Sequence, residues 1–253
     1  MLAGVGLGTI MVHIVCLQPI MGMNGAAETL VSQAYGANQL RQCGVYLNRG
    51  RLINTVLFIP LVVIICFSRP ILTAFGQDPE VIDHAMTYIT VCIPSVYFQI
   101  MFDLKKRFLN CMTYSWVPML AQTGGTILHV LWCYILVVHL DLQVVGLGLA
   151  TAITNVGIFL MITIYAHCIP KIKESLFCFD DSAWSGWGEY FKLGVPSTVM
   201  ICAEWWAFEI LIFLAGAIGV KEQAAMVIIN QITTQTYMVN LGMQESSTAL
   251  IGN

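Results

Sequence analysis

Residues 193–217 read LGVPSTVMICAEWWAFEILIFLAGA, an apolar run with only two charged side chains, Glu204 and Glu209. A helix that crosses the hydrocarbon core of a bilayer needs about 20 predominantly apolar residues, and this run is long enough. Its polar and apolar side chains do not alternate as they would in a half-buried β-strand. The run therefore predicts a membrane-spanning α-helix that carries two carboxyl groups inside the membrane.

The composition of the whole chain agrees with this interpretation. The 253 residues are 58% hydrophobic and 10% charged, whereas soluble domains carry about 25% charged residues. So few charges cannot cover the surface of a water-soluble protein. The net charge of −3 gives no bulk basicity for a nucleic-acid partner. We therefore expect an integral membrane protein whose main partner is the lipid bilayer.

Stretches without Asp, Glu, Lys or Arg define the other expected spans. Together with the first run they give seven predicted helices, at residues 1–27, 52–68, 84–102, 108–140, 142–170, 193–217 and 223–244. Turn-forming residues separate several of them, at 36–38, 76–79, 141 and 219. The predicted fold class is an all-α, polytopic transmembrane helix bundle.

The longest polar stretch, residues 169–192, includes Trp184 and Trp187. Because tryptophan favours the headgroup level of a membrane, this stretch is interpreted as an amphipathic interfacial linker, with an ordinary loop as the alternative.

Basic residues are distributed unevenly between the two sides of the predicted bundle. Nine of the eleven lie in segments 36–51, 103–116 and 169–192 or at their ends, and only Arg69 and Lys221 lie in the alternate segments. Cytoplasmic loops carry the excess of Lys and Arg, so the first set is predicted to be cytoplasmic. The chain then starts near the outer face and ends near the inner face. Both ends adjoin a predicted span directly, so both ends look cut.

No pattern of metal ligands or catalytic groups stands out. The nine cysteines are scattered without Cys-x-x-Cys spacing, and most lie in apolar runs. They are interpreted as small packing residues rather than metal ligands or disulfide partners. The spans also lack the clustered His, Asp or Ser of a nucleophilic or metal centre. The sequence therefore predicts neither a metal site nor an enzyme, and no cofactor.

The two intramembrane glutamates are the sharpest candidate site. A charge at this depth costs several kcal/mol unless it is hydrated, paired or protonated. Glu204 and Glu209 are therefore interpreted as functional groups near a water-filled cavity, and the alternative is a hydrogen-bonded carboxyl that joins two helices. Five residues turn a helix by about 140°, so at most one of them faces the centre of a cavity. Glu28, Asp103 and Glu245 lie nearer the predicted inner face and are interpreted as interfacial or capping residues.

Three motifs resemble those of one transporter family. Residues 204–209, EWWAFE, are followed by Ile210, Leu211 and Gly216 and resemble the seventh-helix signature of eukaryotic MATE (multidrug and toxin extrusion) transporters. Residues 25–37, GAAETLVSQAYGA, resemble the end of the second helix of that family. Residues 237–242, YMVNLG, with SS at 246–247 and GN at 252–253, resemble the end of its eighth helix.

The resemblance implies a fold of twelve helices in two six-helix lobes with a pseudo-repeat. Residues 1–168 would be the remainder of the N-terminal lobe, family helices two to six. Residues 169–192 would be the cytoplasmic inter-lobe linker. Residues 193–253 would begin the C-terminal lobe, as family helices seven and eight. Helix one and helices nine to twelve would be partners supplied from outside this chain, and the chain alone is expected to be inactive.

The resemblance also implies a function. Members of the family export organic cations and other xenobiotics in exchange for H⁺ or Na⁺, so the only cofactor implied is the coupling ion. Glu204 corresponds to the principal coupling carboxylate and Glu209 to its companion. Trp205, Trp206 and Gln33 belong to the same motifs and are predicted to contribute to the substrate or proton site. Gln231 stands where vertebrate members carry a glutamate, a departure that bears on cation selectivity.

Two other functions are considered. Seven spans with an outer start and an inner end are also the topology of a seven-span receptor, but the chain lacks an Asp-Arg-Tyr triplet after the third run and an Asn-Pro-x-x-Tyr in the last span. A lipid or oligosaccharide flippase of a related two-lobe fold is the alternative within transport. The plasma membrane and the vacuolar membrane are not distinguished.

Overall fold

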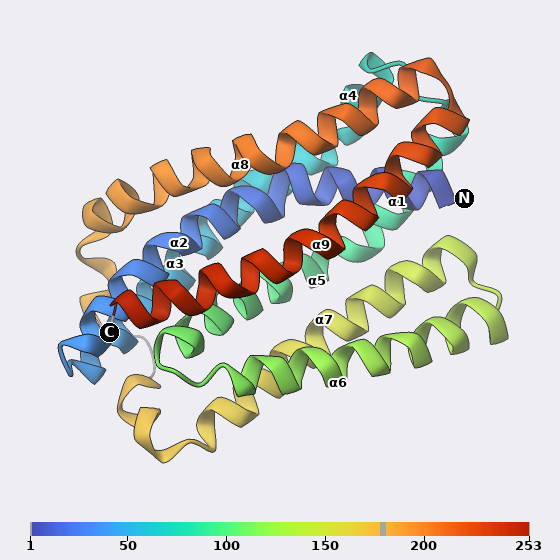
Figure 1. Cartoon of the computed structure of the whole chain (residues 1–253). Coiled ribbons are helices and arrows are strands. Elements are labelled where there is room, and N and C mark those ends of the chain that lie inside the picture. Colours follow the sequence, from blue (N-terminus) through green and yellow to red (C-terminus); the bar gives the residue numbers. More distant parts are fainter. Residues whose placement is uncertain (1, 178–180, 253) are drawn as a thin grey trace.

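The computed structural model describes residues 2–177 and 181–252, and the described residues contain helices and no strand (Figure 1). The first rod combines α1 (Leu2–Val12), the π-helical turn η1 (His13–Leu17) and α2 (Gln18–Gly36). The wide turn precedes Pro19, which has no N–H to donate to the preceding turn of the helix. The expected span at 1–27 is therefore the charge-free part of a longer helical rod.

The remaining helices follow the predicted order. They are α3 (Leu40–Cys66), the short α4 (Ser68–Ala74), α5 (Pro79–Cys111), α6 (Trp116–Cys133) with its π-helical continuation η2 (Tyr134–His139), α7 (Gln143–His167), α8 (Trp187–Ile218) and α9 (Val220–Gly252). Two 3-10 turns, η3 (Pro170–Ser175) and η4 (Asp181–Trp184), precede α8. The described part of the stretch predicted as an amphipathic linker thus forms short turns, and α8 already begins at Trp187.

The predicted breaks form turns for identifiable reasons. Asn38 and Asp141 adopt positive φ angles of 58° and 51°, which Asn and Asp tolerate better than most residues. The Asp78 side chain accepts a hydrogen bond from the backbone N–H of Glu80 and so caps α5. The turn at Gly219 separates α8 from α9.

Two expectations need correction. The segments expected as loops at 36–51 and 103–116 are largely helical, because α3 and α5 continue beyond their charge-free parts. A run without charges marks only the part of a helix suited to hydrocarbon. In addition, six helices among the described residues are long and apolar enough to cross a membrane, and α9 is not one of them. This helix forms as expected, but it carries many Asn, Gln and Thr side chains.

The packing places α2 near the centre of the molecule. α2 contacts α3, α5 and α8, whereas α6 and α7 form an outlying pair that joins the rest through α5 (Figure 1). One apolar core holds Leu47, Phe108 and Tyr190, and a second holds Leu7, Ile20 and Ile89. The outer side of α6 remains apolar and exposed, as at Ile127 and Val130, which suits contact with lipid.

The three segments predicted to be cytoplasmic meet at one end of the bundle. Asn38 after α2, Tyr114 after α5 and Lys171 of η3 line one shared pocket there. These three segments therefore lie at the same end of the bundle, as their common assignment to one side requires.

Candidate functional site

The carboxyl group of Glu204 lies between the last two helices. Glu204 is exposed on the side of α8 that faces α9, and its Oε1 accepts a hydrogen bond of 2.8 Å from the hydroxyl of Tyr237. Tyr237 comes from α9, so this bond joins two helices that follow each other in the chain across the turn at Gly219. The ring of Tyr237 meets the ring of Trp205 edge to face, with centroids 5.7 Å apart and planes at 89°.

These groups enclose a small cavity of about 40 Å³. Its lining comes from one stretch of each helix: Glu204, Trp205 and Phe208 from α8, and Asn230, Thr233, Thr234 and Tyr237 from α9. A volume of this order holds about one water molecule. The cavity combines a carboxylate with aromatic walls and with hydroxyl and amide groups. Carboxylates and aromatic faces attract organic cations. The hydroxyl groups can form hydrogen bonds with the carboxyl group when it is protonated.

Glu209 lies in different surroundings. The residue is only 7% exposed, and its Oε2 is buried without a hydrogen-bond donor among the described residues. The predicted rotation between the two glutamates is therefore present in the structure: one carboxyl group faces α9, and the other is buried elsewhere along α8.

The other predicted site residues do not join this cavity. Trp206 is 38% exposed, and Gln231 and Gln33 are also exposed; none of the three belongs to the cavity lining. Gln33 lies near the opposite end of α2 from the π-helical turn. Of the six predicted residues, the structure brings only Glu204 and Trp205 together here.

The polar lining from α9 is missing from the sequence-based prediction of the site. Asn230, Thr233, Thr234 and Tyr237 recur at the three- and four-residue spacing of one helix face. This spacing could have identified them, although it would not have shown which helix they face.

A second polar cluster is buried in the first half of the chain. The guanidinium of Arg107 joins two acidic residues in this cluster. Its Nη1 donates to Glu28 Oε2 at 2.5 Å, and its Nε donates to Asp103 Oδ2 at 3.1 Å. Asp103 Oδ2 also accepts a hydrogen bond from Asn24, and the Asn24 side-chain oxygen accepts one from Asn54. Glu28 and Asp103 lie inside α2 and α5 rather than at helix ends, so the interpretation as capping residues was wrong. Both pair with Arg107 across these two helices.

Beside this cluster lies a cavity of about 190 Å³. Asp103 and Lys106 of α5 line it, and Gln99, Gln122 and Asn155 contribute amide groups. Its polar lining comes from α5, α6 and α7, so it is separate from the cavity at Glu204.

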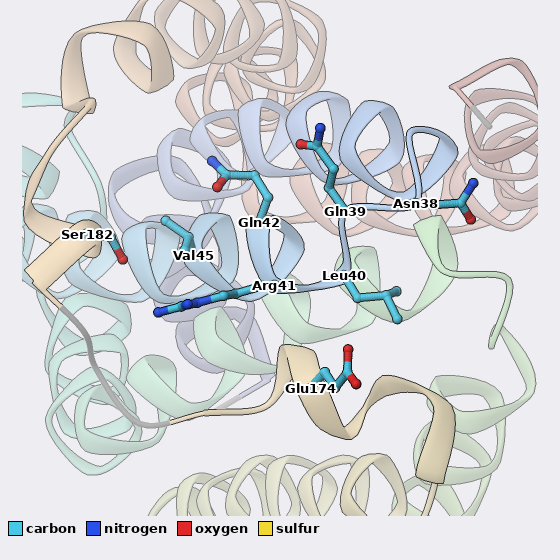
Figure 2. A pocket seen from close by; sticks show the side chains of 8 residues that line it. All are labelled: Asn38, Gln39, Leu40, Arg41, Gln42, Val45, Glu174 and Ser182. Carbon is cyan, nitrogen blue, oxygen red and sulfur yellow. The ribbon is translucent and has the colours of Figure 1, made fainter.

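Another pocket lies at the end of the bundle, beside the turn between α2 and α3 (Figure 2). It has a volume of about 560 Å³ and mixes Arg41 and Glu174 with polar side chains: Asn38, Gln39, Gln42 and Ser182. None of the predicted site residues lines it.

Comparisons with known proteins agree on one family. The family model described as MatE matches residues 1–135 and 196–253. Multidrug and toxin extrusion protein 1 of Danio rerio is 30% identical over 252 residues, which are 100% of this chain and 43% of that protein. Multidrug and toxin extrusion protein 2 of Pongo abelii is 30% identical over 94% of this chain and 41% of its own length. The chain thus spans less than half the length of these relatives.

Solved structures agree in fold. A crystal structure of a eukaryotic MATE transporter superposes with a TM-score of 0.86 at 23% identity, over 99% of this chain and 60% of that one. A multidrug resistance MATE transporter in an inward-facing conformation superposes with a TM-score of 0.72 at 16% identity, over 99% of this chain and 61% of that one.

Proposed function

Because this chain belongs to the MatE family, whose members are multi-pass transporters rather than enzymes, we propose that it forms part of an antiporter in which Glu204 exchanges a coupling ion for substrate. The substrates would be organic cations and other xenobiotics, and the coupling ion H⁺ or Na⁺. The relatives are named for multidrug and toxin extrusion, which supports the substrate class.

The observation that carries this proposal is the bond between Glu204 and Tyr237 at the edge of a cavity shared by α8 and α9. A hydrogen bond to an ionised acceptor is shorter and stronger than one between neutral groups. The tyrosine hydroxyl therefore holds the Glu204 carboxyl in position at the edge of the cavity.

The exchange follows from competition for this one carboxylate. A proton cancels the charge of Glu204 and weakens the attraction for a cationic substrate. The cavity of about 40 Å³ is too small for an organic cation, so α8 and α9 have to move apart to admit one. The restored charge of Glu204 and the face of Trp205 then stabilise the bound cation. Proton and substrate then exclude each other, as antiport requires.

Glu209 is proposed to be a companion carboxylate to Glu204 that does not contact the substrate. Its burial apart from the cavity excludes direct competition with substrate in this conformation. Gln231 supplies no charge where vertebrate members carry glutamate, so Glu204 is the acidic group of the cavity lining described here. Because the chain spans less than half of its relatives' length, activity is proposed for the complete assembly of helices.

The test is Glu204→Gln, which keeps the side-chain volume and resembles the protonated state. Uptake of a fluorescent organic cation is measured in proteoliposomes with an imposed pH gradient, at matched protein levels and with all family helices present. Removal of the charged group should lower pH-driven uptake at least about tenfold. Glu209→Gln is the matched control and should reduce uptake less. Wild-type uptake and pH dependence in Glu204→Gln would remove this residue from the mechanism.

A further inference from the structure

The segment before α8 is fixed along one side of α3. The Asn48 side chain donates a hydrogen bond of 3.3 Å to the carbonyl oxygen of Phe177. At Gly44 the approach is so close that a Cβ atom would lie 2.4 Å from the carbonyl oxygen of Ser175. This docking brings the first turn of α8 next to Arg49, one turn further along α3.

Arg49 is buried in an unusual way for an arginine. The residue is 5% exposed, and its guanidinium lies 5.2 Å from the centroid of the Tyr46 ring. On another side it lies against Gly186, where a Cβ atom would fall 2.8–3.0 Å from Nη2, Cζ and Nη1. Its Nε is buried and has no hydrogen-bond partner in the part of the chain that the structure describes. A buried guanidinium normally pairs with an anion or a carbonyl group.

Gly186 is also the N-cap of α8, and it makes no side-chain capping bond. The first four N–H groups of a helix have no acceptor within the helix, and the dipole gives this end a partial positive charge. A guanidinium and a helix N-terminus thus lie side by side, both with hydrogen-bond donors to offer. The acidic residue of the first turn is Glu189, whose side chain is exposed.

The position of this site in the fold indicates which anion is available. It lies in the basic segments predicted to be cytoplasmic. Trp184 is 63% exposed and stacks on Trp187, with centroids 6.1 Å apart. Exposed tryptophans concentrate at the headgroup level of membranes, where phosphate is the common anion.

We propose that Arg49 and the N-terminus of α8 form a binding site for a phosphate group, in the membrane that of an anionic phospholipid. Guanidinium forks and helix N-termini both recognise phosphate through N–H groups. Bound there, the phosphate neutralises Arg49 and satisfies the first turn of α8. It thereby fastens the start of α8 to α3 at the membrane surface.

The test counts lipids retained by the purified chain in native mass spectrometry, with phosphatidylglycerol and phosphatidylcholine in equal amounts. The wild-type chain should prefer phosphatidylglycerol. Arg49→Gln should reduce this preference about tenfold, the effect expected for a lost charge-assisted bond. Gly186→Ala changes no charge but should displace the guanidinium, and so should reduce the preference as well. Arg49→Lys keeps the charge and should retain part of it.

Arg41→Gln is the matched control, since Arg41 is exposed at the same end of the bundle and lies outside this site. It should leave the preference unchanged. An equal loss in Arg41→Gln and Arg49→Gln would show diffuse attraction by basic residues and would overturn the proposal, as would a wild-type chain without preference. Added inorganic phosphate distinguishes the source of the anion: displacement of phosphatidylglycerol identifies a site for free phosphate, and retention identifies a lipid site.

Discussion

The proposed exchange depends on the hydroxyl group of Tyr237. Tyr237→Phe removes the 2.8 Å bond to Glu204 but keeps a ring that can meet Trp205 edge to face. A hydrogen bond to a charged group contributes about 1.5–3 kcal/mol, so cation uptake driven by a pH gradient should fall about tenfold or more. Tyr165→Phe is the control, because Tyr165 lies on α7 away from this cavity. Equal uptake by the two variants would contradict a role for the hydroxyl.

Arg107 is the residue on which the buried charge cluster depends. Its side chain is 11% exposed, and its acidic partners Glu28 and Asp103 are 14% and 9% exposed. Arg107→Leu would leave two carboxylates without their main partner, at a cost of about 3–5 kcal/mol. Thermal unfolding in detergent should therefore shift to clearly lower temperature.

The control for Arg107 is another ion pair between an arginine and an aspartate, which is exposed rather than buried. Arg69 and Asp83 form an ion pair whose side chains are 58% and 64% exposed. Exposed ion pairs contribute about 0–1 kcal/mol, so Arg69→Leu should change the unfolding temperature little. A comparable loss in both variants would mean that the burial of the Arg107 cluster adds nothing to its effect on stability.

At the scale of helices, the contact between α2 and α8 depends on the absence of a side chain at Gly22. A Cβ atom there would lie 2.4 Å from the Cα of Thr198, and the Thr198 hydroxyl donates a 3.2 Å bond to the carbonyl of Pro19. Gly22→Ala should therefore force the helices apart and destabilise the protein by about 1–3 kcal/mol.

Gly157→Ala provides the comparison for this close approach, because a Cβ at Gly157 meets nothing within 4 Å. Alanine is favoured over glycine inside a helix by about 1 kcal/mol. This variant should unfold at the same temperature as the wild type or higher. If Gly22→Ala behaved in the same way, the two helices would not be in the close contact described.

At the scale of the whole molecule, the uneven distribution of basic residues predicts orientation in the membrane. Single cysteines replace Lys173 and Asp78, both exposed, in a background without other cysteines. A membrane-impermeant thiol reagent should label position 173 from the cytoplasmic side and position 78 from the opposite side. Labelling of position 78 only from the cytoplasm would reverse the orientation.

The class of fold could be predicted from the sequence, because the free energy of placing charges in hydrocarbon limits where helices can span. Runs without charges located the helices, and turn residues such as Asn38 and Asp141 located the breaks. Helix lengths were underestimated, because a charged residue such as Arg49 or Arg107 interrupts an apolar run without ending a helix. The same energetic reasoning singled out Glu204 and Glu209, and helical rotation predicted that they face different ways.

Which side chains meet could not be predicted without the packing of the helices. Tyr237 reaches Glu204 across 33 residues, and Arg107 reaches Glu28 across 79. Helical periodicity assigns a residue to a face of its own helix, but it carries no information about the neighbouring helix. Trp205 and Trp206 are adjacent in the sequence, and only Trp205 lines the cavity. The partner of each face is set by how the helices pack around α2, since close contacts such as that of Gly22 with Thr198 allow one arrangement and exclude others.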